Sequence, residues 1–425
     1  MGLAALFDPG QPMSITELIN PQVHDARAVR RAGPELLELA LMDARNRSLA
    51  WLAALDGLAF DVAAPSVQHE LDPPNWLVGH TAWFQELWIA RNVQRGRGEA
   101  ADPKGPRLPS VQRRADTWFD PQSSTRERRW ADAGPDQDGL RSYLAQTLDT
   151  TLDLLEKAPA SPNALHFFRL ALHCEDRCAE QLAMLAQALD LPTDQYPEFW
   201  QPLPVRVRRD PVWLPGQCIR LGNDEPGAWR PVAEDGRIEE SVPAFEIDAQ
   251  PVCWAQWAEF AADGGYDQRS CWSDAGWDWI ETTGRRAPRY VEQQSAGVLA
   301  WRQGRLQMMP AAQAALHLAW YEAQAWCRWA GRRLPHEAEW VLAQRNASAR
   351  GFAWGDALEW VADRAAAWPG QRPAPGEQAD VPQPGQRVQR GASFAASPRL
   401  RHPSARRFAA ATADAAFCGF RSCAV

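Results

Sequence analysis

The hydrophobic pattern of this chain changes character near Pro192. Before that point, apolar residues recur every three or four positions in four long segments, which is the spacing of amphipathic helices. After it, short apolar runs alternate with Gly and Pro, and only residues 252–262 and 316–330 keep a clear helical period. The break predicts a helical domain followed by an irregular, Trp-rich α+β domain.

Boundary signals refine this division. The second helical segment opens with Asp72-Pro73-Pro74. Asp72 is expected to cap the helix, and a Pro in the first turn costs no hydrogen bond because the N–H at that position has no partner within the helix. The fourth opens at Ser161-Pro162 and runs through Leu185. Four long helices with one extended connection, 96–124, predict a bundle with functional groups facing inward. The predicted parts are a four-helix bundle over 25–191, a Pro-rich linker over 192–215 and an α+β domain over 216–425.

Composition excludes several classes of protein. With 425 residues and 45% apolar content, two domains are expected. The net charge of -8 comes without any basic block, so nucleic acid is not expected as a partner. Eight Cys are too few for a disulfide scaffold. Neither a signal peptide nor an uncharged apolar stretch of about 18 residues is evident. We therefore expect a cytoplasmic protein that does not bind membranes.

The sharpest chemical signal lies in the fourth helix. Cys174 and Cys178 are four residues apart, so both sulfurs share one helix face and can hold one metal ion. His80, on the apolar stripe of the second helix, is the candidate for a third ligand. The alternative is that both Cys are small core residues and His80 is a hydrogen-bonded core histidine, and the spacing alone favours this alternative.

Two other pairs have spacings that suggest chemistry. Glu337 and Glu339 have the spacing of an acid-base pair. Cys418 and Cys423, five positions apart, resemble a redox or copper pair.

Longer motifs place the chain beside a known family. Over about 36–425 the chain resembles the ergothioneine sulfoxide synthases and most of all their proteobacterial relatives, the selenoneine synthases. The motifs that carry this resemblance are Asp72-Pro-Pro-Asn-Trp-Leu-Val-Gly-His80, Phe167-Phe-Arg-Leu-Ala-Leu172 with Glu175, Asp176 and Glu180, Gly331-Arg-Arg-Leu-Pro-x-Glu-Ala-Glu-Trp340, Arg390-Gly-x-Ser-Phe394, Arg399-Leu-Arg-His-Pro403 and Phe417-x-Gly-Phe-Arg421.

The resemblance implies a fold and a reaction. The fold is a DinB-like four-helix bundle joined to a C-type-lectin-like domain of the formylglycine-generating type. The reaction uses O2 and a non-heme iron(II) held by three His to join sulfur or selenium of a cosubstrate, a thiol or a selenosugar, to imidazole C2 of hercynine. By this resemblance the metal ligands are His80, Cys174 and Cys178, and Glu180 is the trailing Glu of the family motif.

The resemblance also implies structural roles for the two other pairs. In this family type Glu337 and Glu339 lie at a helix start with structural hydrogen bonds. Cys418 and Cys423 lie on the terminal strand motif of the family, where packing is the simpler explanation. We therefore favour the structural interpretation of both pairs.

This sequence departs from the family pattern at central positions. Cys174 and Cys178 stand where the family has His, and thiolates favour zinc or copper(I) over iron(II). Trp368 stands where relatives have a Tyr implicated in proton or electron delivery, and Trp has no acidic hydroxyl. The stretch 409–413 is small and uncharged where the family carries charges, so only Asp414 is left to contact substrate there.

Four arginines complete the expected site. Guanidinium groups bind carboxylates through two parallel hydrogen bonds, so we expect Arg390, Arg399, Arg401 and Arg421 to orient substrate or to structure the cleft. The main alternative is a diverged family member without oxygenase activity that binds a metal or a small molecule. A formylglycine-generating enzyme acting on protein Cys is a weaker interpretation, because the helical bundle would then be superfluous.

Overall fold

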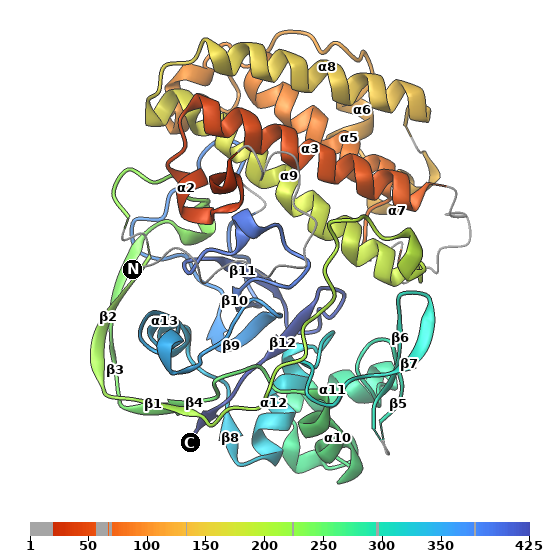
Figure 1. Cartoon of the computed structure of the whole chain (residues 1–425), viewed down its shortest axis with the longest axis vertical. Coiled ribbons are helices and arrows are strands. Elements are labelled where there is room, and N and C mark those ends of the chain that lie inside the picture. Colours follow the sequence, from red (N-terminus) through yellow and green to blue (C-terminus); the bar gives the residue numbers. More distant parts are fainter. Residues whose placement is uncertain are drawn as a thin grey trace.

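The computed structural model describes residues 20–56, 67, 70–132, 134–222, 225–294, 297–377 and 380–425. Helices of the first half gather at one end of the molecule, and the sheets of the second half lie at the other (Figure 1). The long helix α9 (Pro162–Ala188) lies on the side of the helical part that faces the C-terminal sheets. This arrangement agrees with the predicted order of a helical part followed by a sheet-containing part.

Four long helices pack against one another in the N-terminal part, and α9 contacts the other three. Its 27 residues are amphipathic, with a nearly continuous buried face from Ala164 to Gln187. Ser161 caps the helix as predicted, because its side chain accepts a hydrogen bond from the backbone N–H of Ala164. The remaining helices of this part are η1 (Pro21–His24), α2 (Ala26–Arg30), α3 (Pro34–Leu55), α5 (Pro74–Gln85), η3 (Glu86–Ala90), η4 (Arg95–Ala100), α6 (Ala115–Phe119), α7 (Arg126–Ala131), α8 (Gln137–Glu156) and η5 (Thr193–Gln195).

The expected cap of the second long helix is wrong. Pro73, not Asp72, is the N-cap residue of α5, and no side chain accepts a hydrogen bond at that end. The carboxylate of Asp72 instead accepts a hydrogen bond from Arg129 at 2.8 Å. Asp72 thereby connects the start of α5 to α7. Its carboxylate makes this contact between two helices in place of a cap on its own helix.

The C-terminal part is built from small sheets covered by helices. Its helices are η6 (Val232–Glu234), α10 (Trp254–Ala262), η7 (Arg269–Cys271), α11 (Asp274–Thr283), α12 (Trp320–Trp329), α13 (Glu337–Asn346), η8 (Ser348–Arg350) and η10 (Pro398–Leu400). Its strands are β1 (Val212–Leu214), β2 (Gln217–Gly222), β3 (Arg237–Val242), β4 (Phe245–Ile247), β5 (Val291–Gln293), β6 (Leu299–Arg302), β7 (Arg305–Met308), β8 (Arg332–Arg333), β9 (Leu358–Arg364), β10 (Gln386–Gly391), β11 (Arg406–Ala410), β12 (Cys418–Phe420) and β13 (Cys423–Ala424).

Two four-stranded sheets organise this part, with orders β1-β4-β13-β8 and β11-β10-β9-β12. Strand β12 runs parallel to β9, whereas β10 and β11 pair antiparallel. Successive residues of β9 serve different cores, because strand side chains alternate between faces. Trp360 packs in the cluster of α10 and α12, and Val361 packs in the cluster of α13. The sheet therefore separates two hydrophobic cores.

Both paired motifs of the second half are structural. Glu337 and Glu339 open α13, where Glu337 accepts a hydrogen bond from Arg406 at 2.7 Å and Glu339 binds Arg333 at 2.7 Å. Cys418 and Cys423 are free thiols on different strands, buried in different cores. Among the described residues, no helix is both long enough and apolar enough to cross a bilayer.

Candidate functional site

The second half of α9 presents its charged side chains to the C-terminal part. Asp176 accepts hydrogen bonds from the guanidinium of Arg399, the shortest at 2.7 Å. About one helical turn further on, Glu180 accepts a hydrogen bond from Ser393 Oγ at 2.5 Å and pairs with Arg407 Nη1 at 2.5 Å. Buried charges are tolerated only when paired, so these contacts fix how the two parts meet.

Arg399 joins three segments of the chain. Besides Asp176, it binds Asp43 Oδ2 on α3 at 2.8 Å and the backbone carbonyl of Val23 at 3.3 Å. Burial alone would raise the pKa of Asp43, but His24 and the cations Arg399 and Arg47 hold that pKa well below its usual range. The predicted substrate-orienting residue Arg399 is therefore fully engaged by protein carboxylates.

The opposite side of α9 carries the two predicted thiol ligands. Cys178 is 3% exposed and Cys174 is half-buried, one helical turn away. Their neighbour Glu175 turns into the bundle and binds Arg45 Nε at 2.6 Å. Burial raises the pKa of Cys174 to about 12 and raises that of Cys178 well above its usual value. Both groups are thus neutral thiols in a largely apolar setting.

His80 on α5 is held by a different set of groups. Its Nδ1 lies 2.8 Å from the backbone carbonyl of Phe119, and its ring stacks on Trp76 at 4.8 Å and Trp83 at 5.5 Å between ring centres. Burial lowers the pKa of His80, so the imidazole is neutral. A neutral ring donates from Nδ1 to this carbonyl and leaves Nε2 as an acceptor.

The segment after β9 covers the helices that carry the predicted ligands. Gly376 has φ of +95°, and a Cβ built on it would lie 3.0 Å from Leu170 and 3.1 Å from Trp88. Only glycine allows the backbone to approach α9 this closely in that conformation. Past residues 378–379, which lie outside the described ranges, Asp380 forms an ion pair with Arg177 of α9. Sequence reasoning missed this segment, because Arg177 and Asp380 are 203 positions apart.

Glu377 anchors this segment in an unusual way. It is 4% exposed, and its carboxyl accepts hydrogen bonds from the backbone N–H groups of Val232 at 2.9 Å and Ala374 at 3.1 Å. Burial raises the pKa of Glu377 to about 8 despite these two donors. The folded protein therefore keeps this carboxyl protonated up to a pH at which the unfolded chain has lost the proton.

A dependence of stability on pH follows for Glu377→Gln. A carboxyl with a raised folded pKa costs no stability below its unfolded pKa of about 4, and it costs progressively more as pH rises toward 8. Between pH 5 and pH 8, we expect the free energy of unfolding to fall by about 2 to 4 kcal/mol more in the unmodified protein than in the Gln variant. Urea unfolding across this range measures the difference. The exposed Glu198→Gln is the control, and identical pH profiles for all three proteins would contradict the raised pKa.

Two of the predicted substrate-binding arginines are structural residues of the C-terminal part. Arg421 is completely buried and binds both oxygens of Glu359, at 2.5 and 2.7 Å. Arg390 is 1% exposed, and it donates to the carbonyls of Pro403 and Ser404 at 3.0 and 3.1 Å. The guanidinium of Arg421 is therefore fully engaged by the protein, whereas the Nε of Arg390 has no hydrogen-bond partner among the described residues.

The other two predicted contacts differ in accessibility. Asp414 is buried and pairs with Arg285 at 2.5 Å and Arg289 at 2.8 Å. Arg401 is exposed, and its Nη2 donates to the carbonyl of Phe394 at 2.7 Å. Of the predicted substrate-binding residues, Arg401 therefore keeps the most accessible donors.

Trp368 lies on a cavity of its own. Arg406 stacks on its ring at 4.1 Å, and the ring borders a cavity of about 410 Å³ together with Arg390, His402 and Arg345. The described residues that line this cavity include none from α9. The structure thus separates Trp368 from the thiols of Cys174 and Cys178.

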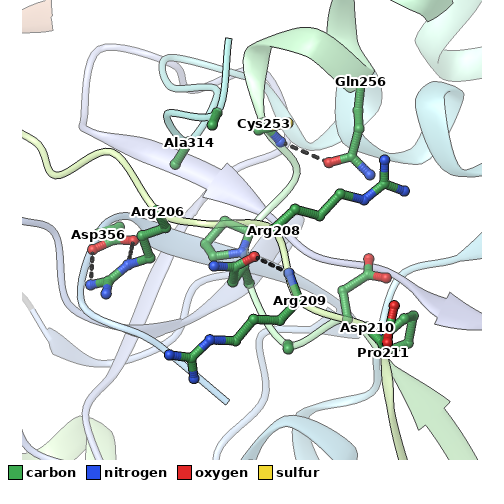
Figure 2. Close-up of a pocket in the computed structure, with 14 residues that line it drawn as sticks. Arg206, Arg208, Arg209, Asp210, Pro211, Cys253, Gln256, Ala314 and Asp356 are labelled. Atoms are coloured by element: carbon green, nitrogen blue, oxygen red, sulfur yellow. Dashed lines mark hydrogen bonds and ion pairs between the residues drawn. The ribbon is translucent and has the colours of Figure 1, made fainter. Parts of the chain in front are cut away.

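A smaller cavity of about 100 Å³ lies along the linker, where Figure 2 shows Arg206, Arg208 and Arg209 near Cys253. Arg206 is already bound to Asp356, with Nη2 2.6 Å from Oδ1. The backbone N–H of Cys253 donates to Gln256 at 3.1 Å, so this residue serves the start of α10. The cavity contains none of the residues predicted for the site.

Comparison with known proteins connects both parts of the chain to one family. Residues 201–368 match the sulfatase-modifying factor enzyme 1-like domain. A hercynine oxygenase of Mycolicibacterium thermoresistibile is 30% identical, over 81% of this chain and 75% of that protein. A hercynine oxygenase of Mycolicibacterium smegmatis is 31% identical, over 80% of this chain and 76% of that protein. The chain belongs to the hercynine oxygenase family.

A shorter match concerns the C-terminal part alone. The formylglycine-generating enzyme of Mycobacterium tuberculosis is 29% identical over 34% of this chain and 54% of that protein. The hercynine oxygenases match both halves, and this confirms the resemblance to the ergothioneine sulfoxide synthases predicted from the motifs.

Within this hercynine oxygenase family member, the expected metal ligands are not assembled. Among the residues that the structure describes, no group of three or more His, Cys, Asp and Glu side chains is placed to hold a metal ion. The donor set, two neutral thiols and a separately held imidazole, does not fit an iron(II) site.

Proposed function

We propose that this hercynine oxygenase family member acts on hercynine or a closely similar imidazole betaine. The reaction we assign is the O2-dependent joining of sulfur or selenium, from a thiol or a selenosugar, to imidazole C2. One observation carries the proposal: hercynine oxygenases match four-fifths of the chain, across both the helical and the sheet-containing part. We also propose the finer fold assignments, a DinB-like bundle over 25–191, a linker over 192–215 and a C-type-lectin-like domain over 216–425, and a cytoplasmic location.

Arg401 is the predicted arginine that we retain as a contact for the substrate carboxylate. It is exposed, and its hydrogen bond from Nη2 to the Phe394 carbonyl leaves other N–H groups of its guanidinium available. Arg390, Arg399 and Arg421 we assign to the framework, because buried carboxylates or carbonyls already use them. Trp368 we assign to the wall of its cavity.

The residues at the three expected metal-ligand positions favour a second candidate function, that of a family member without oxygenase activity. Two of the three are neutral, buried thiols, and the described residues offer no cluster of metal-binding side chains. A family member without oxygenase activity would still bind a small molecule, because recognition depends on many contacts while oxidation depends on metal geometry. This candidate predicts hercynine binding without turnover.

Calorimetry with hercynine and histidine tests whether the protein binds the substrate that both candidate functions require. The two ligands differ in the trimethylammonium group, which aromatic faces attract by about 0.5 to 2 kcal/mol. We expect hercynine to bind about tenfold more tightly than histidine. Mass spectrometry of an aerobic reaction with a thiol then shows whether a carbon-sulfur bond forms. Binding without product selects the second candidate, and no heat from either ligand at millimolar concentration rejects both.

A further inference from the structure

A third cavity lies where α9, the linker and the C-terminal part meet. Its volume is about 140 Å³, and its walls include Gln187 at the end of α9 and the linker residues Tyr196 and Trp200. Gln187 is nine residues beyond Cys178, which corresponds to about 13 Å along the helix. The cavity is therefore separate from the thiol positions that the proposed function concerns.

One side of this cavity is aromatic. Tyr196 and Trp200 lie 4.9 Å apart between ring centres, Trp200 and Phe394 lie 5.3 Å apart, and Phe394 and Phe417 lie 4.9 Å apart. All four rings line the cavity. A cavity of about 150 Å³ is large enough for a benzene molecule, so the aromatic side of this 140 Å³ cavity has room for one aromatic ring.

The other side carries a guanidinium group without a counter-charge. Arg302, at the end of β6, lines the cavity and is half-buried. No described residue forms an ion pair or a side-chain hydrogen bond with it, and the ionisable groups that it influences by charge, Tyr196 and His317, include no carboxylate. Burial lowers the pKa of Arg302 to about 10, so the group stays protonated at neutral pH. An unpaired, partly desolvated cation is costly, and an anionic ligand would offset the cost.

The walls are held in place from several directions. Gln187 donates to the carbonyl of Trp301 at 3.1 Å, which fixes the β6–β7 hairpin to α9. Gln313 donates to the carbonyl of Leu203 at 2.6 Å, which fixes the linker to the C-terminal part. A preformed pocket binds ligand without the cost of ordering its walls.

We propose that this cavity is a second ligand site, which binds a small monocarboxylate with one aromatic ring. The carboxylate pairs with Arg302, and the ring packs against the aromatic wall of Tyr196, Trp200, Phe394 and Phe417. This inference goes beyond the proposed function, because the site includes neither thiol nor any other residue assigned there to hercynine.

The test compares 3-phenylpropionate with the uncharged 3-phenylpropanol by calorimetry on the full-length protein. We expect the carboxylate to bind at least about tenfold more tightly than the alcohol, and Arg302→Gln to remove that preference. Arg305→Gln, on the exposed side of the same hairpin, is the matched control and should bind like the unmodified protein. Equal affinity for the two probes, or undiminished binding of the carboxylate by Arg302→Gln, overturns the proposal, as does the absence of binding at millimolar concentration.

Thermal unfolding gives an independent readout. Because Arg302 has no protein anion, Arg302→Gln should melt at or above the temperature of the unmodified protein without ligand. The carboxylate should raise the melting temperature of the unmodified protein and of Arg305→Gln only. A marked loss of stability in ligand-free Arg302→Gln would show that the protein already uses this guanidinium, and the proposal would fail.

Discussion

Replacing Arg399 by alanine is expected to lower the free energy of unfolding by about 3 to 5 kcal/mol. The side chain is 5% exposed and holds the carboxylates of Asp176 and Asp43, which are 2% and 3% exposed. Removing it leaves two buried negative charges without their cation, and this is the costly way to break a buried ion pair.

Urea unfolding followed by circular dichroism and by Trp fluorescence measures the effect. Coincident transitions would show that the two parts unfold together, and separate transitions would show which part lost stability. Arg220→Ala is the matched control, because the pair of Arg220 and Glu239 is 55% and 70% exposed and should contribute at most about 1 kcal/mol. If Arg399→Ala were as stable as this control, the contact between α9 and the C-terminal part would not depend on the arginine.

The same residues explain what the sequence could and could not predict. Local signals were sufficient for α9, because the 3.6-residue period and the Ser161 cap act within a few positions. The roles of the arginines were not predictable, because a guanidinium suits substrate and protein carboxylates equally well. Asp176, the partner of Arg399, is 223 positions away in the sequence. Only the folded chain shows that its carboxylate binds this guanidinium.

Short helices mark another limit of the sequence pattern. Helix α11 was not expected, although Ser273 caps its start and Gly284 ends it with φ of +65°. The helix has ten residues, one of which is Gly276. Ten residues are too few for an apolar period to be distinguished from the irregular runs around it. The start of α13 was expected from the family resemblance, and Glu339 there accepts a hydrogen bond from the backbone N–H of His336 at 2.7 Å.

The metal-ligand hypothesis shows why spacing alone was insufficient. Cys174 and Cys178 do share one turn of α9, as the four-residue spacing requires. The position of His80 depends on its rotamer, which the Phe119 carbonyl and the rings of Trp76 and Trp83 determine. A sequence can place a residue on an inward helix face, but the direction of its ring depends on contacts made across the fold.

Restoring imidazoles at both thiol positions is expected to change metal selectivity. In Cys174→His with Cys178→His, two nitrogen donors replace soft sulfur donors, and imidazole suits iron while thiolate favours zinc and copper(I). The change also removes two buried thiols that must lose protons before they bind a metal, since burial holds their pKa values far above neutral. We expect the affinity for iron(II) relative to zinc to rise by on the order of tenfold to a hundredfold.

Competitive titration with iron(II) and zinc under anaerobic conditions measures this ratio. The control is Cys218→His with Cys253→His, which introduces the same two imidazoles at an exposed and a half-buried position outside α9. An equal shift in both double variants would mean that added histidines bind metal nonspecifically. An unchanged ratio in the α9 variant would mean that these positions do not ligate a metal together with His80, whose ring is held at the Phe119 carbonyl. The second candidate function would then follow, with hercynine recognition retained on a framework that no longer supports the oxidative step.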